Sequence, residues 1–216
     1  MRAPSLAAVL AALTLSASLL PGQTPGINPL TAADLTRLSP PTRQAIAQLG
    51  DSLRAAGLPD EPLYAKAAEG VLKEASEARI LTAVRTLVRE LGTARGALGG
   101  DVDEAELLAG ASALHVGATP AMLRRLAAAR SSSSPRPRSL ATPLIALTDL
   151  LVRHVPPTAA TTAIDSLVTR GAPSADFAAL RAAVERDIAS GRSPEASVAA
   201  RTQSLLQNIE SRRTGP

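Results

Sequence analysis

Short segments that place a glycine close to a proline recur along this chain and limit what it can fold into. Five such junctions separate stretches with the apolar spacing of helices: Gly57–Pro59, Gly117–Pro120, His154–Pro156, Gly171–Pro173 and Gly191–Pro194. Glycine accepts the left-handed conformation that ends many helices, and proline fits the first turn of the next helix. At one junction histidine takes the place of glycine. The pattern predicts separate helices joined by tight connections.

The stretches between these junctions have the periodicity of amphipathic helices. In residues 76–91, Ile80, Val84 and Leu91 belong to one apolar stripe, and residues 174–188 show a similar stripe. Strand-like alternation with β-branched and aromatic residues is missing. We therefore expect an all-α fold of about eight to ten short helices, stacked as successive antiparallel hairpins in an irregular α-superhelix or bundle.

The N-terminus and one internal segment depart from this pattern. Residues 1–22 combine an early positive charge, a short apolar run and a small, polar exit, which is typical of a secretory signal peptide. Residues 23–41 form a Pro-rich leader, and residues 42–213 form the helical-repeat-like domain. Inside that domain, the serines, prolines and arginines of residues 129–139 predict a flexible loop.

The predicted signal peptide assigns the protein to the exported class, either periplasmic or extracellular. Arginine outnumbers lysine by 21 to 2, and alanine, leucine and proline are abundant, as in GC-rich bacterial coding. The chain has no cysteine, so core burial without disulfides must stabilise it. No later stretch is long and apolar enough for a stable membrane span after signal cleavage. The sequence leaves the oligomeric state open.

The charge of the chain gives weak grounds for a polyanionic partner, because the formal net charge is only +4. Aromatic residues make up 1% of the chain, which removes stacking platforms for bases, so we expect no nucleic-acid partner. One basic stretch surrounds the predicted loop and is a candidate contact for an anion or an acidic partner; the alternative is a solvated linker. Its members are Arg124, Arg125, Arg130, Arg136 and Arg138.

Residues 50–53 read Gly-Asp-Ser-Leu and resemble the four-letter signature of a large family of serine esterases. In that family the serine follows a strand, and a later Asp-x-x-His supplies the base. Here the preceding residues have a helical pattern, and neither His115 nor His154 has an aspartate three positions before it. A serine needs a positioned base and an oxyanion site. We interpret the match as a coincidence within a helix and expect no catalytic residue.

Two further groups of polar residues have side chains of the types that bind metals. Asp101, Asp103, Glu104 and Glu106 are close in sequence, but a calcium loop needs an oxygen ligand and then glycine where this chain has Ala105 and Glu106. We interpret these acids as the first turn of a helix, where the dipole favours them. The two histidines are far apart and have no cysteine partners. We therefore expect neither a metal nor another cofactor.

The hypothesis that follows is a non-enzymatic protein-interaction or scaffold module of the bacterial envelope, with an envelope protein as partner. Stacked helical arrays commonly offer extended binding faces, and this supports the hypothesis. The alternative is an envelope-acting serine hydrolase that uses Gly50-Asp51-Ser52-Leu53.

Overall fold

A computed structural model describes residues 35–133 and 139–214, and within them the chain is all-α. This part contains nine helices and no strand, in agreement with the expected fold class and number of helices. They are α2 (Pro40–Ala55), α3 (Glu61–Leu72), α4 (Glu77–Leu98), α5 (Glu104–His115), α6 (Pro120–Ser132), α7 (Ala141–Val152), α8 (Pro157–Thr169), α9 (Ser174–Ala189) and α10 (Pro194–Thr214). The predicted signal peptide and residues 23–34 of the leader lie outside the described residues.

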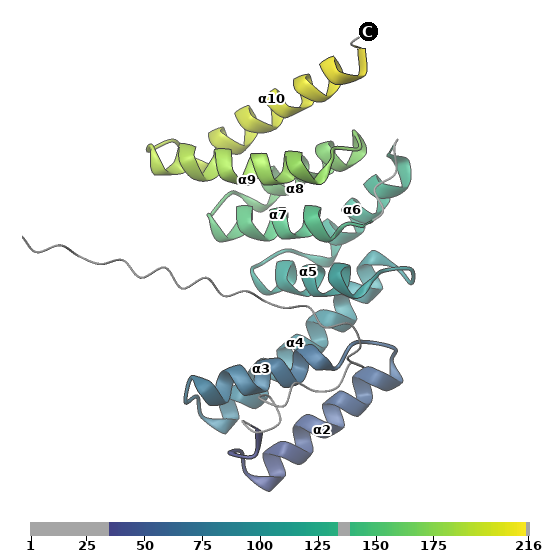
Figure 1. Cartoon of the computed structure of the whole chain (residues 1–216), viewed down its shortest axis with the longest axis vertical. Helices are drawn as coiled ribbons and strands as arrows, with labels where there is room; N and C mark the ends of the chain where they lie inside the picture. The colour runs from purple at the N-terminus through teal and green to yellow at the C-terminus, as the bar shows by residue number, and fades with distance from the viewer. Residues whose placement is uncertain (1–34, 134–138, 215–216) are drawn as a thin grey trace, which may run out of the picture.

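The helices stack in chain order, from α2 at one end to α10 at the other (Figure 1). Helices two apart in the chain are neighbours: α2, α4, α6, α8 and α10 contact one another in succession and are here called the even row. Helices α3, α5, α7 and α9 are called the odd row, in which α7 contacts both α5 and α9. Contacts such as those of α4 with α3 and α5 join the rows. The result is a two-row array.

Six helices of the array end in the same backbone arrangement. One residue at each end has a φ between 54° and 107°, and these residues are Gly57, Glu74, Gly117, His154, Gly171 and Gly191. Its N–H donates to the carbonyl three residues earlier, and the next N–H donates to the carbonyl five residues before itself, over 2.9–3.1 Å. This pair of bonds is the Schellman motif, which satisfies carbonyls at the end of a helix. All five predicted junctions are confirmed.

The sixth junction, at Glu74, was not predicted because it contains neither glycine nor proline. Glu74 and His154 adopt φ values of 54° and 59° with full side chains. The left-handed region costs a residue other than glycine roughly 1–2 kcal/mol. At these two ends the packing of the following helix therefore has to offset a local backbone cost.

The helix after this junction, α4, is tied to the start of α2 by a carboxylate. Glu77 accepts hydrogen bonds from Ser39 N at 2.7 Å and Ser39 Oγ at 2.6 Å, and also from Thr42 Oγ1. The hydrogen bonds from Ser39 and then Thr42 lower the pKa of Glu77, because they favour the charged form. The first turns of α2 and α4 are thereby joined.

The described core consists of two clusters of aliphatic side chains that meet along α4 and α5. One cluster runs from Leu38 to Ala111, and the other runs from Ala94 to Ile209. Val102, in the connection between α4 and α5, packs against both. Helix α4, with 22 residues, is the longest described helix and contributes to both clusters. It therefore links the two halves of the core.

The structure changes the predicted boundaries at two places. Helix α6 continues to Ser132, so residues 129–132 of the predicted loop are helical; Ala129 is buried, and the Ser132 hydroxyl donates to its carbonyl. Helix α2 begins at Pro40, inside the predicted leader, because proline is compatible with a first helical turn. Residues 134–138 lie outside the described residues.

Among the described helices, none has the length and apolar character needed to cross a membrane. This finding agrees with the expectation of no stable membrane span in the domain.

Two glycine substitutions test the role of the left-handed junctions. Gly57 has a φ of 65°, and Gly92 lies within α4; a methyl group at either position would meet nothing within 4 Å. We expect Gly57→Ala to lower the free energy of unfolding by about 1 kcal/mol through backbone strain. Gly92→Ala should raise it by about 0.5–1 kcal/mol, because alanine favours the helix. Urea unfolding followed by circular dichroism measures both, and shifts of the same sign would contradict the assignment.

Candidate functional site

The odd row is interrupted between α3 and α5, where a cleft of about 310 Å³ opens. Both helices pack on α4, which provides part of the cleft floor. Apolar side chains of α4 and α5 line the cleft, and polar side chains come from α3, α4, α5 and α7. The lining residues are Lys66, Ala83, Leu87, Glu90, Ala111, Ser112, His115, Val116 and Thr148. An apolar concavity with a few polar groups is typical of a binding site.

The charged groups of the cleft are already paired with one another or with their own helix. His115 Nδ1 lies 3.1 Å from Glu90 Oε1, which joins α5 to α4, and the His115 side chain is 65% exposed. Lys66 Nζ donates to Glu69 at 2.8 Å. Hydrogen bonds from Lys66 and then Lys73 lower the pKa of Glu69 to about 2. The rim therefore presents both signs of charge in fixed positions.

The hydroxyl groups of the cleft are also used within their helices. Ser112 Oγ donates to Leu108 O at 2.8 Å, and Thr148 Oγ1 donates to Leu144 O at 3.0 Å. A nucleophilic hydroxyl would have to donate its proton to a base instead. In this arrangement neither of these two hydroxyls is paired with a base.

Exposed apolar side chains extend the cleft along α7. Ile145 is 44% exposed and Val152 is 55% exposed, and Thr148 of the cleft lies three and four residues from them. Residues with this spacing share one face of a helix. Within the described residues the only other large apolar side chain that is exposed is Leu72, also in the odd row. The cleft and the exposed face of α7 together form one apolar surface.

The Gly-Asp-Ser-Leu stretch lies in the last turns of α2, where helix packing explains it. Ser52 is exposed and its hydroxyl donates to Gln48 O at 2.8 Å. Asp51 pairs with Arg54, and Leu53 is 2% exposed. A side chain at Gly50 would collide with the hydroxyl of Tyr64 on α3. These four residues follow no strand, which supports our interpretation of the motif as a coincidence.

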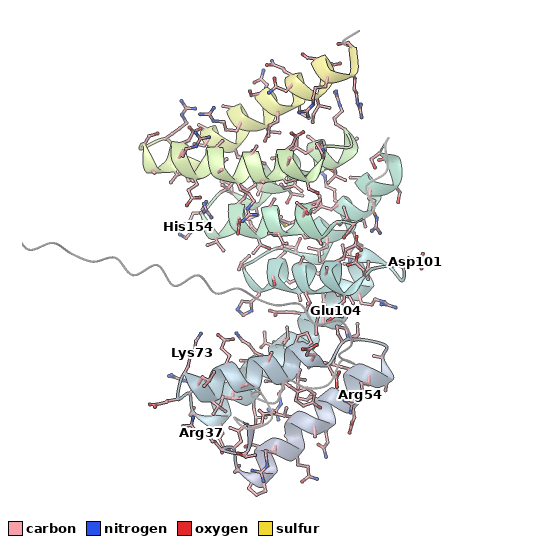
Figure 2. The ribbon with its side chains drawn as sticks, viewed as in Figure 1. Arg37, Arg54, Lys73, Asp101, Glu104 and His154 are labelled. Atoms are coloured by element: carbon pink, nitrogen blue, oxygen red, sulfur yellow. The ribbon has the colours of Figure 1, made fainter. Side chains whose placement is uncertain are left out.

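The acidic residues 101–106 occupy the connection into α5 and its first turn, as interpreted from the sequence. Figure 2 shows Asp101 and Glu104 at this connection, and Asp103 caps α5 by accepting a hydrogen bond from Glu106 N at 2.7 Å. His154 lies elsewhere, at the end of α7 (Figure 2). Within the described residues no three His, Asp or Glu side chains gather as metal ligands would.

Glu106 has a role that its place in the acidic run of the sequence does not indicate. Its side chain is buried, with 1% exposure. Its Oε1 atom accepts from Arg130 Nη1 at 2.8 Å and from the backbone N–H of Leu140. Arg130 belongs to α6, and Leu140 directly precedes α7. The carboxylate therefore joins the chain on both sides of residues 134–138 to α5.

Of the five arginines proposed as an anion contact, Arg124, Arg125 and Arg130 lie within the described residues, on α6, and their surroundings differ. Arg130 is partly buried, with a side chain 12% exposed, and pairs with the buried Glu106. Arg125 donates from Nε and Nη2 to Asp165 of α8, at 3.0 and 2.7 Å. Arg124 is exposed and has no carboxylate partner in the described part of the chain. Arg136 and Arg138 lie outside it.

The cleft between α3 and α5 is thus the candidate site, and its lining residues do not stand out as a group in the sequence. The sequence gives only a weak signal for this site, because the residues that line the cleft come from four helices between residues 66 and 148. Comparisons of the chain with protein-family models, with curated proteins and with solved structures find no match.

Neighbouring arginines of α6 provide a matched test of the buried pair. Arg130→Gln leaves the Glu106 carboxylate buried without its cation, so we expect a loss of about 3 kcal/mol in the free energy of unfolding. Arg124→Gln, which removes the same charge from an exposed position, should change it by less than about 0.5 kcal/mol. Chemical denaturation measures both. Equal effects would show that Arg130 has no special role in stability.

The Gly50 contact is tested in the same way. Gly50→Ala should destabilise the protein by about 1 kcal/mol, because the cost of displacing the Tyr64 side chain exceeds the gain in helix propensity. Adding Tyr64→Phe should recover part of that loss, because the colliding hydroxyl is gone. Ser52→Ala should stay within about 0.5 kcal/mol of the parent chain. Thermal unfolding of the parent chain and of the three variants measures these differences in stability. A Gly50→Ala variant as stable as the parent would contradict the packing explanation.

Proposed function

We propose that the protein is a non-enzymatic interaction or scaffold module of the bacterial envelope and binds a protein partner through the cleft between α3 and α5. The observation that carries this proposal is the cleft itself together with the exposed Ile145 and Val152 beside it. Contiguous exposed apolar surface with a polar rim is characteristic of protein-binding sites. The chemistry fits a partner that inserts an apolar side chain into the cleft and places polar groups beside the ion pairs of its rim.

The two-row array supports this function because it holds the lining of the cleft on rigid elements. Each lining helix is packed on at least one other helix, and the floor residue Leu87 packs against the N-terminal core cluster. A preformed site loses little conformational entropy on binding. We further propose that consecutive helices that pack on each other, such as α9 and α10, run as antiparallel hairpins, since only four residues separate these two.

Export and envelope location are part of the same proposal and rest on residues 1–22. Their charge, apolar run and polar exit are those of a signal peptide. The alternative of a serine hydrolase receives no support from the surroundings of Ser52, whose hydroxyl bonds within its own helix.

Site-specific cross-linking tests the proposal. A photoreactive residue is placed at Ile145 in the chain from Gln23 onward, which is exposed to an envelope extract of the native host. We expect one or a few proteins to be cross-linked. Thr148→Arg, at the rim of the cleft, should abolish the product by placing a bulky charge there. Ser204→Arg adds the same charge at an exposed site on α10 and should leave the product unchanged.

Two results would contradict the proposal. The first is a folded chain that yields no product from Ile145, and the second is a product that both arginine variants reduce equally. Circular dichroism of each variant ensures that loss of the product does not reflect unfolding.

A further inference from the structure

The two rows of helices differ in charge. Counted over the helices alone, the even row carries six more cations than acids, whereas the odd row carries five more acids than cations. The low net charge of the whole chain conceals this separation. Because the rows lie on opposite sides of the core, the array has a basic side and an acidic side.

The basic excess is concentrated on α4 and α6, which are neighbours in the even row. Together these helices contain seven arginines and two acids. Both acids are engaged elsewhere: Glu77 bonds to Ser39 and Thr42, and Glu90 faces His115. Arg125 and Arg130 have carboxylate partners. Five arginines have none within the described residues, and these are Arg79, Arg85, Arg89, Arg95 and Arg124.

Three of these arginines lie on the outward side of the even row. Arg85 and Arg89 are exposed and four residues apart, so they share one face of α4. Gly92 and Gly96 continue that face, and nothing lies within 4 Å of where their side chains would be. Arg124 is exposed on the adjacent α6. We call Arg85, Arg89 and Arg124 the arginine surface; the two glycines leave it open beside Arg89.

We propose that the arginine surface docks the protein on an anionic phospholipid membrane. Guanidinium groups pair with phosphate in a bidentate manner, and an open row of them matches a plane of headgroups. The exposed large apolar side chains of the described residues all lie in the odd row, so the even row adsorbs by charge without inserting. The predicted export brings the chain to such membranes. The cleft then faces away from the membrane and stays open to a partner.

A membrane explains the surface better than a nucleic acid does. Recognition of a single-stranded nucleic acid relies on aromatic side chains on which bases stack. The chain has one tyrosine and one phenylalanine, and these lie on α3 and α9 of the odd row.

Vesicle co-sedimentation tests the proposal with the chain from Gln23 onward, which contains every described residue. We expect binding to phosphatidylcholine vesicles that contain phosphatidylglycerol, no binding to pure phosphatidylcholine, and loss of binding at high salt. The triple variant R85Q/R89Q/R124Q should lower the partition coefficient at least roughly tenfold. The matched variant K73Q/R181Q/R186Q removes three cations at the odd row outside the cleft and should bind as the parent chain does.

Three outcomes would overturn the proposal. Equal losses in the two triple variants would show that binding follows net charge and not this surface. Unchanged binding of R85Q/R89Q/R124Q would locate any membrane contact elsewhere. Tighter binding to single-stranded DNA than to the anionic vesicles, lost in the same variant, would assign the arginines to a nucleic acid.

Discussion

A single residue in the left-handed conformation ends each of six helices, and the two-row arrangement depends on this local geometry. The Schellman bonds at such a residue satisfy the last carbonyls and turn the chain out of the helix within two or three residues. The next helix therefore starts close to the end of the previous one, and at four of the six junctions the two helices also pack on each other. Glycine adopts this conformation without strain, whereas Glu74 and His154 adopt it at a cost. Two kinds of interaction therefore hold the array: hydrogen bonds within each junction, and core contacts between helices that are far apart in the sequence.

The length of α4 separates the two surfaces that we assign to binding. Its 22 residues reach both core clusters, and its sides serve different purposes. Leu87 and Glu90 line the cleft, whereas Arg85 and Arg89 lie on the outward side of the even row. A membrane contact and a protein contact then use different sides of one helix. A rigid α4 would fix the orientation of a bound partner relative to the membrane surface.

The all-α class and most junctions could be predicted because they follow from local chemistry. Gly57 and Gly171 predict their turns because glycine favours the left-handed conformation. Glu74 gives no such signal, since its surroundings force it into the same conformation. Arg130 was grouped with Arg124 because the two are close in sequence. Arg130 lies seven residues after Leu123 and four after Leu126, so it belongs to the same side of α6 as these buried leucines. This spacing indicates that Arg130 faces the core side and not the solvent. The cleft could not be predicted, because it depends on which helices pack together.

The Glu106 carboxylate closes the base of the connection between α6 and α7. Through Arg130 and the N–H of Leu140, it holds both flanks of residues 134–138 against α5. The positions of the two helices therefore do not depend on how many residues connect them. Because the entropy of closing a loop grows slowly with its length, this connection can lengthen at little cost once its base is closed. It is the natural place in the chain for an insertion, where evolution or an engineer could add a segment without disturbing either binding surface.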